Sequence, residues 1–209
     1  MYKLIKIISV FAFMISLSSC SSLSSFRTEN PISMSQYKAI RFDGEQTIKF
    51  KANRIEVVSK FSPSFTRPNV EHLSPISIEK TAKNWAKDLL LANNFTSKEY
   101  VKYIINDASI TEELNKSTSI FRKNTVSYIA KINVTVQVVN EKNKVLAETT
   151  TDAWRRATIT DGTPITDKEV LWYELIENLF NQYDVKQKQT ISQYLNLYLQ
   201  KSKLAKEYI

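Results

Sequence analysis

The chain has 209 residues, of which 43% are apolar, so we expect one domain with a sizeable core. Its one cysteine, Cys20, excludes an intramolecular disulfide, and its one histidine leaves too few ligands for a zinc site. The formal net charge of +8 favours anionic partners such as nucleic acid, lipid or glycan surfaces.

Residues 1–19 have the features of a secretory signal peptide. Lys3 and Lys6 make the start positive, residues 7–17 are apolar, and two serines follow. The apolar stretch has eleven residues, whereas a membrane-spanning helix needs about 20. We therefore expect the segment to be removed, which leaves a net charge of +6. An exported chain meets little nucleic acid, so we expect no nucleic-acid partner.

The segment ends in Leu17-Ser18-Ser19-Cys20, which resembles the bacterial lipobox: a branched apolar residue, two small residues and a cysteine. The resemblance implies that Cys20 carries acyl chains, palmitate among them, and begins the mature lipoprotein. Several acyl chains anchor a protein stably to a membrane. Ser21 in place of aspartate resembles the outer-membrane sorting pattern, which implies a periplasm-facing chain on the outer membrane of the cell envelope. The alternative is an ordinary signal peptide with a chance cysteine.

Residues 20–36 are rich in serine and predict a flexible tether behind the lipidated cysteine. The tether would span on the order of 20–25 Å on average. Residues 37–209 are expected to form a single periplasmic α+β domain.

The first half of this domain predicts a strand, a long loop and a helix. Apolar alternation favours a strand over about 53–60, with a shorter strand before it. Three prolines make 61–77 a semi-rigid loop. Apolar residues at helical spacing then predict a helix over 78–92, capped by Ser74 or Ser77 and ended by two asparagines.

The middle of the domain predicts three further strands. Residues 101–110 favour a strand, and 112–119 form a polar patch. Strict alternation of apolar and polar residues predicts a strand over 127–138. A turn at 140–143 returns the chain as a strand over 144–158.

A helical pattern completes the domain. After a turn at 161–164, the spacing of Thr166 and Glu169 predicts a capping box. The residues that this helix is expected to bury are Trp172, Leu175, Ile176, Leu179 and Tyr183. A second helical pattern contains Ile191, Tyr194, Leu195 and Tyr198. The sequence leaves open whether the helix bends or breaks at Asp184-Val185.

These elements predict an α+β fold, a two-layer sandwich. The sheet is expected to be mainly antiparallel with about four strands, because its best strand has one apolar face. The two amphipathic helices are available to cover that face of the sheet.

Four residues of the proline loop, Arg67, Asn69, Glu71 and His72, are candidates for partner binding. They lie between a predicted strand and a predicted helix, where binding residues often occur. The alternative is a rigid crossover that apolar residues pin to the core, with Arg67 and Glu71 paired locally.

A second candidate for partner binding is Trp154, Arg155 and Arg156, because Trp and Arg are enriched at binding hot spots. Alternation places Trp154 and Arg156 on one face of the strand and Arg155 on the other. The alternative is an exposed strand end whose tryptophan packs on a helix.

We expect no enzyme activity, no cofactor and no metal. Catalytic triads of the Ser–His–Asp or Cys–His kind need a histidine, and the chain has only one. Cys20 is not available as a nucleophile, because it is expected to carry lipid. The two glycines lie too far apart for a phosphate-binding loop. Glu56 with Glu71, or Glu112 with Glu113, would supply paired carboxylates, but nothing in the sequence distinguishes them from surface charge.

The layout of lipobox, tether and α+β domain resembles the auxiliary lipoproteins of lipid-trafficking ABC systems and the lipopolysaccharide-assembly lipoprotein. More closely, an alphaproteobacterial lipoprotein group without a known activity is similar in four segments: RIEVV (54–58), RPNVEH (67–72), NWAKDLL (84–90) and EVLWYEL (169–175). The architectural resemblance carries over Cys20 and no other residue.

We therefore expect a non-enzymatic envelope lipoprotein that binds a protein partner as an accessory in lipid transport or outer-membrane assembly. Alternatives are a lipid or small-molecule carrier, with an acyl chain between sheet and helices, and a regulator of peptidoglycan synthesis. An interior cavity would favour the carrier, and a solid core with an exposed apolar patch would favour the protein partner.

Overall fold

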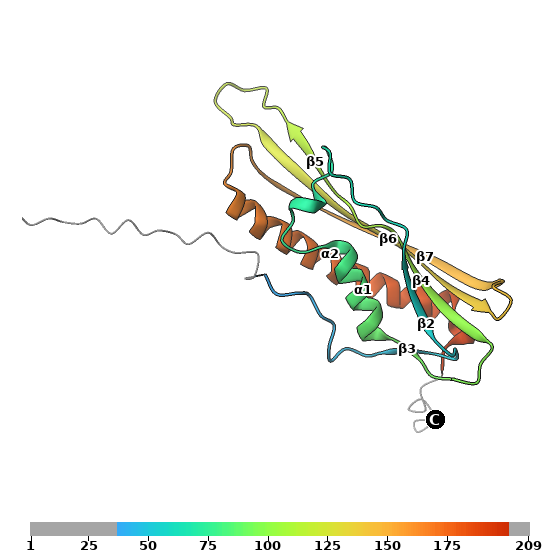
Figure 1. Ribbon diagram of the computed structural model, residues 1–209. Coiled ribbons are helices and arrows are strands. Elements are labelled where there is room, and N and C mark those ends of the chain that lie inside the picture. The colour runs from blue at the N-terminus through green and yellow to red at the C-terminus, as the bar shows by residue number, and fades with distance from the viewer. Residues whose placement is uncertain (1–36, 201–209) are drawn as a thin grey trace, which may run out of the picture. The chain divides into compact units, whose positions relative to one another are not determined.

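A computed structural model describes residues 37–200 (Figure 1). The predicted signal peptide, Cys20 and the tether lie outside the described residues. The elements in chain order are β1 (Ile48–Phe50), β2 (Ile55–Ser59), the 3-10 turn η2 (Glu71–Leu73), α1 (Ile78–Leu89), β3 (Leu90–Ala92), β4 (Glu99–Asp107), β5 (Ile110–Asn115), β6 (Thr125–Asn140), β7 (Val145–Thr160), α2 (Ile165–Tyr194) and the 3-10 turn η3 (Asn196–Tyr198).

Five strands form the main sheet, and β6 is at its centre. β7 pairs antiparallel with one edge of β6, while β4 and β5 pair antiparallel with the other edge, one after the other. β2 adds to β4 in parallel. The α+β class and the mainly antiparallel sheet are therefore confirmed, with one strand more than expected and a separate parallel pair, β1 with β3.

The alternation in β6 divides the sheet into a covered face and an open face. Both helices lie on the same side of the sheet (Figure 1). The β6 side chains buried beneath them are Val126, Tyr128, Ala130, Ile132, Val134, Val136 and Val138. A helix of 30 residues is about 45 Å long and a strand of 16 residues about 50 Å, so α2 can follow the β6–β7 hairpin along nearly its whole length.

An aromatic centre, formed by Trp85, Tyr103, Tyr183 and Asp184, joins both helices to β4. The Trp85 ring stacks on Tyr103 at 5.8 Å between centroids and meets Tyr183 edge-on at 5.5 Å. Trp85 Nε1 donates to Asp184 Oδ1 at 2.8 Å, and the two tyrosine hydroxyls share a hydrogen bond of 2.6 Å. The polar atoms of these buried rings are thus satisfied, as stable burial requires.

Helix α1 is shorter than predicted. It begins after Ser77, whose side chain accepts from the Lys80 amide, but it ends at Leu89. Residues 90–92 form β3 instead, because the neighbouring β1 offers them a parallel strand partner, with Ile48 opposite Leu90. The prediction that the helix extends to Ala92 is therefore wrong.

Two further expectations about element bounds are wrong. The polar patch begins inside a strand, because residues 110–115 form β5 along the edge of β6. The capping box is absent, since α2 begins at Ile165 with Pro164 before it and no side-chain cap. The question left open at Asp184-Val185 is answered: α2 continues through both residues to Tyr194.

Candidate functional site

A pocket of about 450 Å³ lies on the helix-covered side of the sheet, at the end where β5, β6 and the start of α2 meet. We call it the Arg67 pocket. The residues that line it are Arg67, Pro68, Glu112, Leu114, Val126, Tyr128, Asp161 and Lys168. They come from the proline loop, two strands, the β7–α2 turn and the first turn of α2.

The proline loop reaches the pocket because it pairs with the outer edge of β5. The Val70 amide donates to the Ile110 carbonyl at 2.8 Å, and the Glu112 amide donates to the Pro68 carbonyl at 2.8 Å. An isolated bridge between Asn69 and Thr111 lies between these two bonds. The backbone pairing therefore fixes Arg67 beside the side chain of Glu112.

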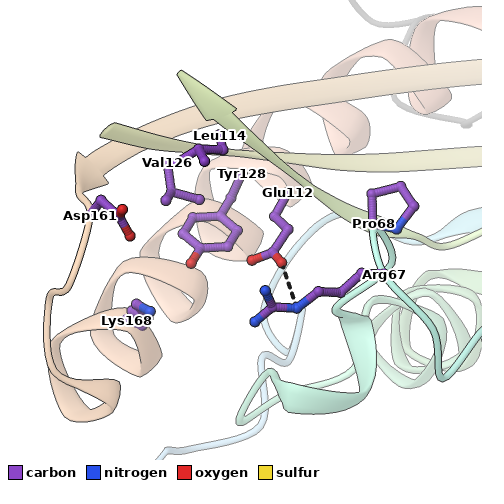
Figure 2. A pocket seen from close by; sticks show the side chains of 8 residues that line it. All are labelled: Arg67, Pro68, Glu112, Leu114, Val126, Tyr128, Asp161 and Lys168. Carbon is purple, nitrogen blue, oxygen red and sulfur yellow. Dashed lines mark ion pairs between the residues drawn. The ribbon is translucent and has the colours of Figure 1, made fainter. Parts of the chain in front are cut away.

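Arg67 and Glu112 form an ion pair across the pocket (Figure 2). Arg67 Nε lies 2.9 Å from Glu112 Oε1, yet the arginine side chain is 81% exposed and the glutamate only 17%. Pairs with one partner in solvent contribute little to stability, because water screens and competes for the cation. Glu112 is thus a largely covered carboxylate with an exchangeable partner.

Tyr128 forms the inner wall of the pocket. Figure 2 shows its hydroxyl pointing into the space between Arg67 and Lys168. Burial, and then the negative charge of Glu112, raise the pKa of the Tyr128 hydroxyl, while Arg67 opposes the shift. The ring meets Trp172 of α2 edge-on at 5.3 Å, which holds it in place. The pocket therefore offers a neutral hydroxyl that can donate or accept a hydrogen bond.

The remaining lining residues make the pocket amphipathic. Asp161 and Lys168 add a carboxylate and an ammonium group on the α2 side (Figure 2). Leu114 is half exposed, and Val126 lies beside it as an apolar floor. Such a site can bind an anionic or hydrogen-bonding group together with a small apolar group.

Of the four candidate residues in the proline loop, Arg67 alone lines the pocket. Asn69 is bound to β5 through its backbone bridge. Glu71 accepts a hydrogen bond of 2.7 Å from the Ser64 amide, which closes the loop on itself. His72 is exposed and lies with its ring 5.4 Å from that of Phe65. Asn69 and Glu71 therefore shape the loop that presents Arg67.

The second candidate set is divided between the two faces of β7. Trp154 is 58% exposed on the open face, so it does not pack on a helix. Arg156, on the same face, lies 3.5 Å from Glu113. Arg155 points to the other face and lines a shallow hollow beside α2. The structure thus does not join this set to the Arg67 pocket.

The two carboxylate pairs considered from the sequence do not converge. Glu112 and Glu113 are neighbours on a strand, so their side chains point to opposite faces and pair with Arg67 and Arg156 respectively. Glu56 pairs with Arg54 at 2.8 Å, whereas Glu71 is used within the proline loop. Across residues 37–200, no group of three or more His, Cys, Asp or Glu side chains is placed to hold a metal ion.

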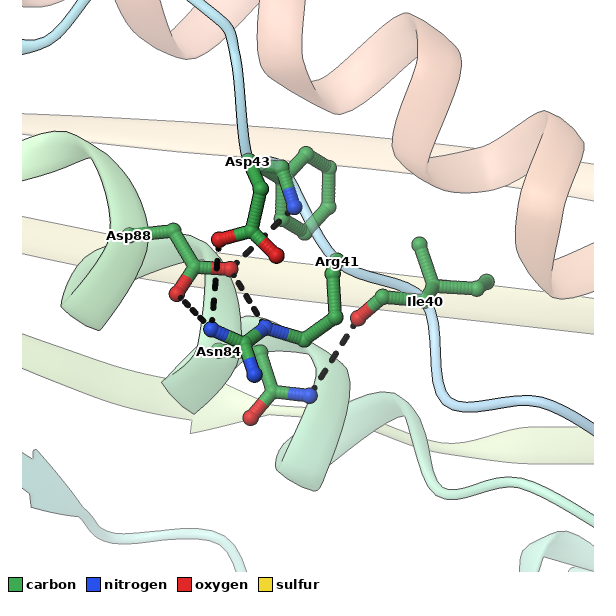
Figure 3. Close-up of polar contacts among 6 residues, drawn as sticks. Ile40, Arg41, Asp43, Asn84 and Asp88 are labelled. Carbon is green, nitrogen blue, oxygen red and sulfur yellow. Dashed lines mark hydrogen bonds and ion pairs between the residues drawn. The ribbon is translucent and has the colours of Figure 1, made fainter.

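A second polar cluster serves the fold and not a pocket (Figure 3). Arg41 donates to both oxygens of Asp88, at 2.8 and 2.6 Å, and the Phe42 amide adds a bond of 3.1 Å. The hydrogen bonds from Arg41 are the main reason why the pKa of Asp88 is lowered. Asn84 donates to the Ile40 carbonyl at 3.2 Å. These contacts fasten the first described residues onto α1.

Four polar pocket residues were not among the residues predicted to bind a partner: Glu112, which was considered only as a paired carboxylate, Tyr128, Asp161 and Lys168. One signal was present in the sequence. Ile110, Glu112 and Leu114 occupy alternate positions, so a strand there places a carboxylate on an otherwise apolar face. The other three are brought together by the hairpin and by the return of α2, which local patterns do not encode.

None of the helices in residues 37–200 combines the length and the apolar composition that crossing a membrane requires.

No protein-family model matches the chain. No curated protein is similar to it in sequence. Among solved structures, it is similar to a minor lipoprotein from Acinetobacter baumannii, with 12% identity and a TM-score of 0.36 over 68% of this chain and 95% of that one. Rare lipoprotein B from Shewanella oneidensis is 10% identical, with a TM-score of 0.39 over 69% of this chain and 98% of that one. A homolog of neuraminyllactose-binding hemagglutinin from Helicobacter pylori is 9% identical, with a TM-score of 0.32 over 75% and 90% of the two chains. Similarity at this level assigns neither a family nor an activity.

Proposed function

We propose that the protein is a lipid-anchored, non-enzymatic component of the bacterial cell envelope whose α+β domain binds a partner at the Arg67 pocket. The observation that supports binding there is the covered carboxylate of Glu112 under an arginine that is 81% exposed. A partner that brings its own cation can replace Arg67, and one that brings an anion can bind Arg67 and Lys168. The motif Leu17-Ser18-Ser19-Cys20 supports the lipid anchor.

The filled core favours a protein partner over an acyl chain held between sheet and helices. The aromatic centre occupies the space between α1, α2 and β4, with ring centroids 5.5 to 5.8 Å apart. The half-exposed Leu114 gives the pocket rim an apolar contact for a protein side chain. We propose for the domain an accessory role in lipid transport or outer-membrane assembly, in line with its resemblance in layout to such lipoproteins; the further resemblance to the alphaproteobacterial group adds no activity.

A second candidate function is the binding of a small molecule. The pocket volume of about 450 Å³ is within the roughly 300–1,000 Å³ that small-molecule sites have. The mixture of hydroxyl, carboxylate and cationic groups around an apolar floor is also typical of such sites.

The pocket is tested by crosslinking in intact cells. A photoreactive residue in place of Leu114 should yield one defined protein adduct, while the same residue in place of the exposed Leu197, outside the pocket, should not. The adduct should weaken when Lys168→Gln is added. Equal adducts from both positions, or none from Leu114, would contradict partner binding at this site.

The anchor is tested by Cys20→Ala in the full chain. We expect the wild type to fractionate with the outer membrane and to partition into the detergent phase. The variant should stay uncleaved or become soluble in the periplasm. Ser22→Ala is the matched control and should behave as the wild type. A variant that is cleaved normally and still partitions into detergent would contradict lipid anchoring.

A further inference from the structure

The tip of the β5–β6 hairpin, residues 116–124, exposes two large apolar side chains. Ile120 is 93% exposed and Phe121 is 91% exposed, the highest fractions among the large hydrophobic residues that the structure describes. Contact between water and large apolar side chains is unfavourable, and neighbouring apolar side chains that are exposed together mark interaction sites.

Hydrogen bonds within the tip hold these two side chains outward. The Asn124 side chain accepts from the Ser117 amide at 2.9 Å, and Ser119 Oγ accepts from the Phe121 amide at 3.3 Å. The Arg122 amide donates to the Ser119 carbonyl at 3.2 Å. Because these backbone groups have partners inside the tip, part of the cost of moving it out of water is already met.

The charge of the tip is entirely positive. Lys116, Arg122 and Lys123 flank the apolar pair, and residues 114–124 contain no aspartate or glutamate. Apolar side chains between cations suit the boundary of an anionic lipid layer, where the apolar groups enter the acyl region and the cations meet phosphate.

The tip lies at the end of the fold where α2 begins. The Asp161 amide donates to the Asn124 carbonyl at 2.9 Å, so the tip adjoins the turn that begins α2 (Figure 1). Tyr37, the first described residue, lies with its ring 5.4 Å from that of Tyr173. Tyr173 is eight residues into α2, about 12 Å along the helix axis.

We propose that the hairpin tip inserts Ile120 and Phe121 into the surface of an anionic lipid bilayer, with Lys116, Arg122 and Lys123 on the headgroups. This contact is additional to the proposed acyl anchor and does not need it. Inserted in this way, the tip brings the Arg67 pocket close to the bilayer, because Leu114 and Val126 of the pocket lie on the strands that lead to the tip.

The test is vesicle binding by the full chain carrying Cys20→Ala, which removes the acyl anchor. The vesicles are an equal mixture of phosphatidylcholine and phosphatidylglycerol, with pure phosphatidylcholine for comparison. We expect Ile120→Ser/Phe121→Ser to lower the partition coefficient by about tenfold or more, since both side chains lose apolar burial. Lys123→Gln should lower it by about fivefold on the anionic vesicles and very little on the neutral ones.

Phe95→Ser is the matched control. Phe95 is 82% exposed in the loop between β3 and β4, and its substitution should leave vesicle binding unchanged. Phe121→Trp supplies a second readout, a blue shift of the new tryptophan when anionic vesicles are added. Equal vesicle binding by the Cys20→Ala chain with and without the double serine change, or an unshifted Phe121→Trp spectrum, would overturn the proposal and leave a protein surface as the partner of the tip.

Discussion

The aromatic centre and the Arg67 pocket both place a carboxylate between the sheet and the helices, but they satisfy it differently. Asp184 accepts from the buried Trp85 indole at 2.8 Å and from Lys188 at 2.8 Å. Glu112 pairs with an arginine that is mostly in water. The first carboxylate is part of the core, and the second has a partner that a ligand can displace.

Because of this difference, the aromatic centre contributes to stability and the Arg67 pocket is available for binding, although both lie between the sheet and the helices. The centre joins α1, β4 and α2 through rings that have no exposed surface. The pocket is closed by a loop residue and by the first turn of α2. Substitutions in the centre should therefore change the free energy of unfolding, and substitutions in the pocket should change binding.

The largest expected effect is that of Trp85→Ala. The change removes a fully buried ring and one of the two hydrogen-bond donors to Asp184, so the free energy of unfolding should fall by about 3–5 kcal/mol. Urea denaturation measures it. Trp154→Ala, at an exposed tryptophan, should lower the free energy of unfolding by less than about 1 kcal/mol. A loss equal to that of Trp85→Ala would contradict the special contribution of the aromatic centre to stability.

The tyrosine pair of the centre predicts a smaller, pH-dependent effect. Burial raises the pKa of Tyr103 and Tyr183 above the ordinary value of 10.0. A raised folded-state pKa gives stability that is fully present below pH 10 and is lost as the pH rises above it, because the unfolded chain then ionises first. Urea midpoints measured from neutral pH upward should therefore fall above about pH 10.

Tyr103→Phe sharpens this prediction. It leaves the Tyr183 hydroxyl without its 2.6 Å partner and should cost about 1–3 kcal/mol at neutral pH. The double change Tyr103→Phe/Tyr183→Phe should cost less than the single one, and it should weaken the fall in stability above pH 10. Tyr194→Phe, at an exposed tyrosine, is the control. A double variant as pH-sensitive as the wild type would contradict the assignment.

The smallest expected effect on stability is that of Arg67→Gln. Since the arginine side chain is 81% exposed, its removal should change the free energy of unfolding by less than about 0.5 kcal/mol. The same variant should weaken the crosslink from position 114. A loss of stability comparable to that of Trp85→Ala would mean that the pocket is part of the core.

The strongest local patterns predicted the fold well. Six alternating apolar residues of β6 and the helical spacing in α1 and α2 gave the layers, because each pattern reports directly which side is buried. Errors occurred where a neighbour decided the outcome. Residues 90–92 left the helix because β1 was beside them, and residues 110–115 became a strand because the edge of β6 was available.

The candidate site was predicted only in part, for the same physical reason. The prolines identified the loop, and Arg67 does line a pocket. Its counterpart Glu112 lies 45 positions further along the chain and is brought there by backbone pairing between the loop and β5. No short pattern encodes such a contact.

That pairing gives the proline loop a second role, as a guard against aggregation. An uncovered strand edge is a template on which other chains can add as strands. The Val70 amide donates to the carbonyl of Ile110, and the Pro68 carbonyl accepts from the amide of Glu112, so the outer edge of β5 is closed there. A ligand that drew the loop away from the pocket would reopen this edge. Such a ligand would couple occupancy of the site to the solubility of the protein through these two hydrogen bonds.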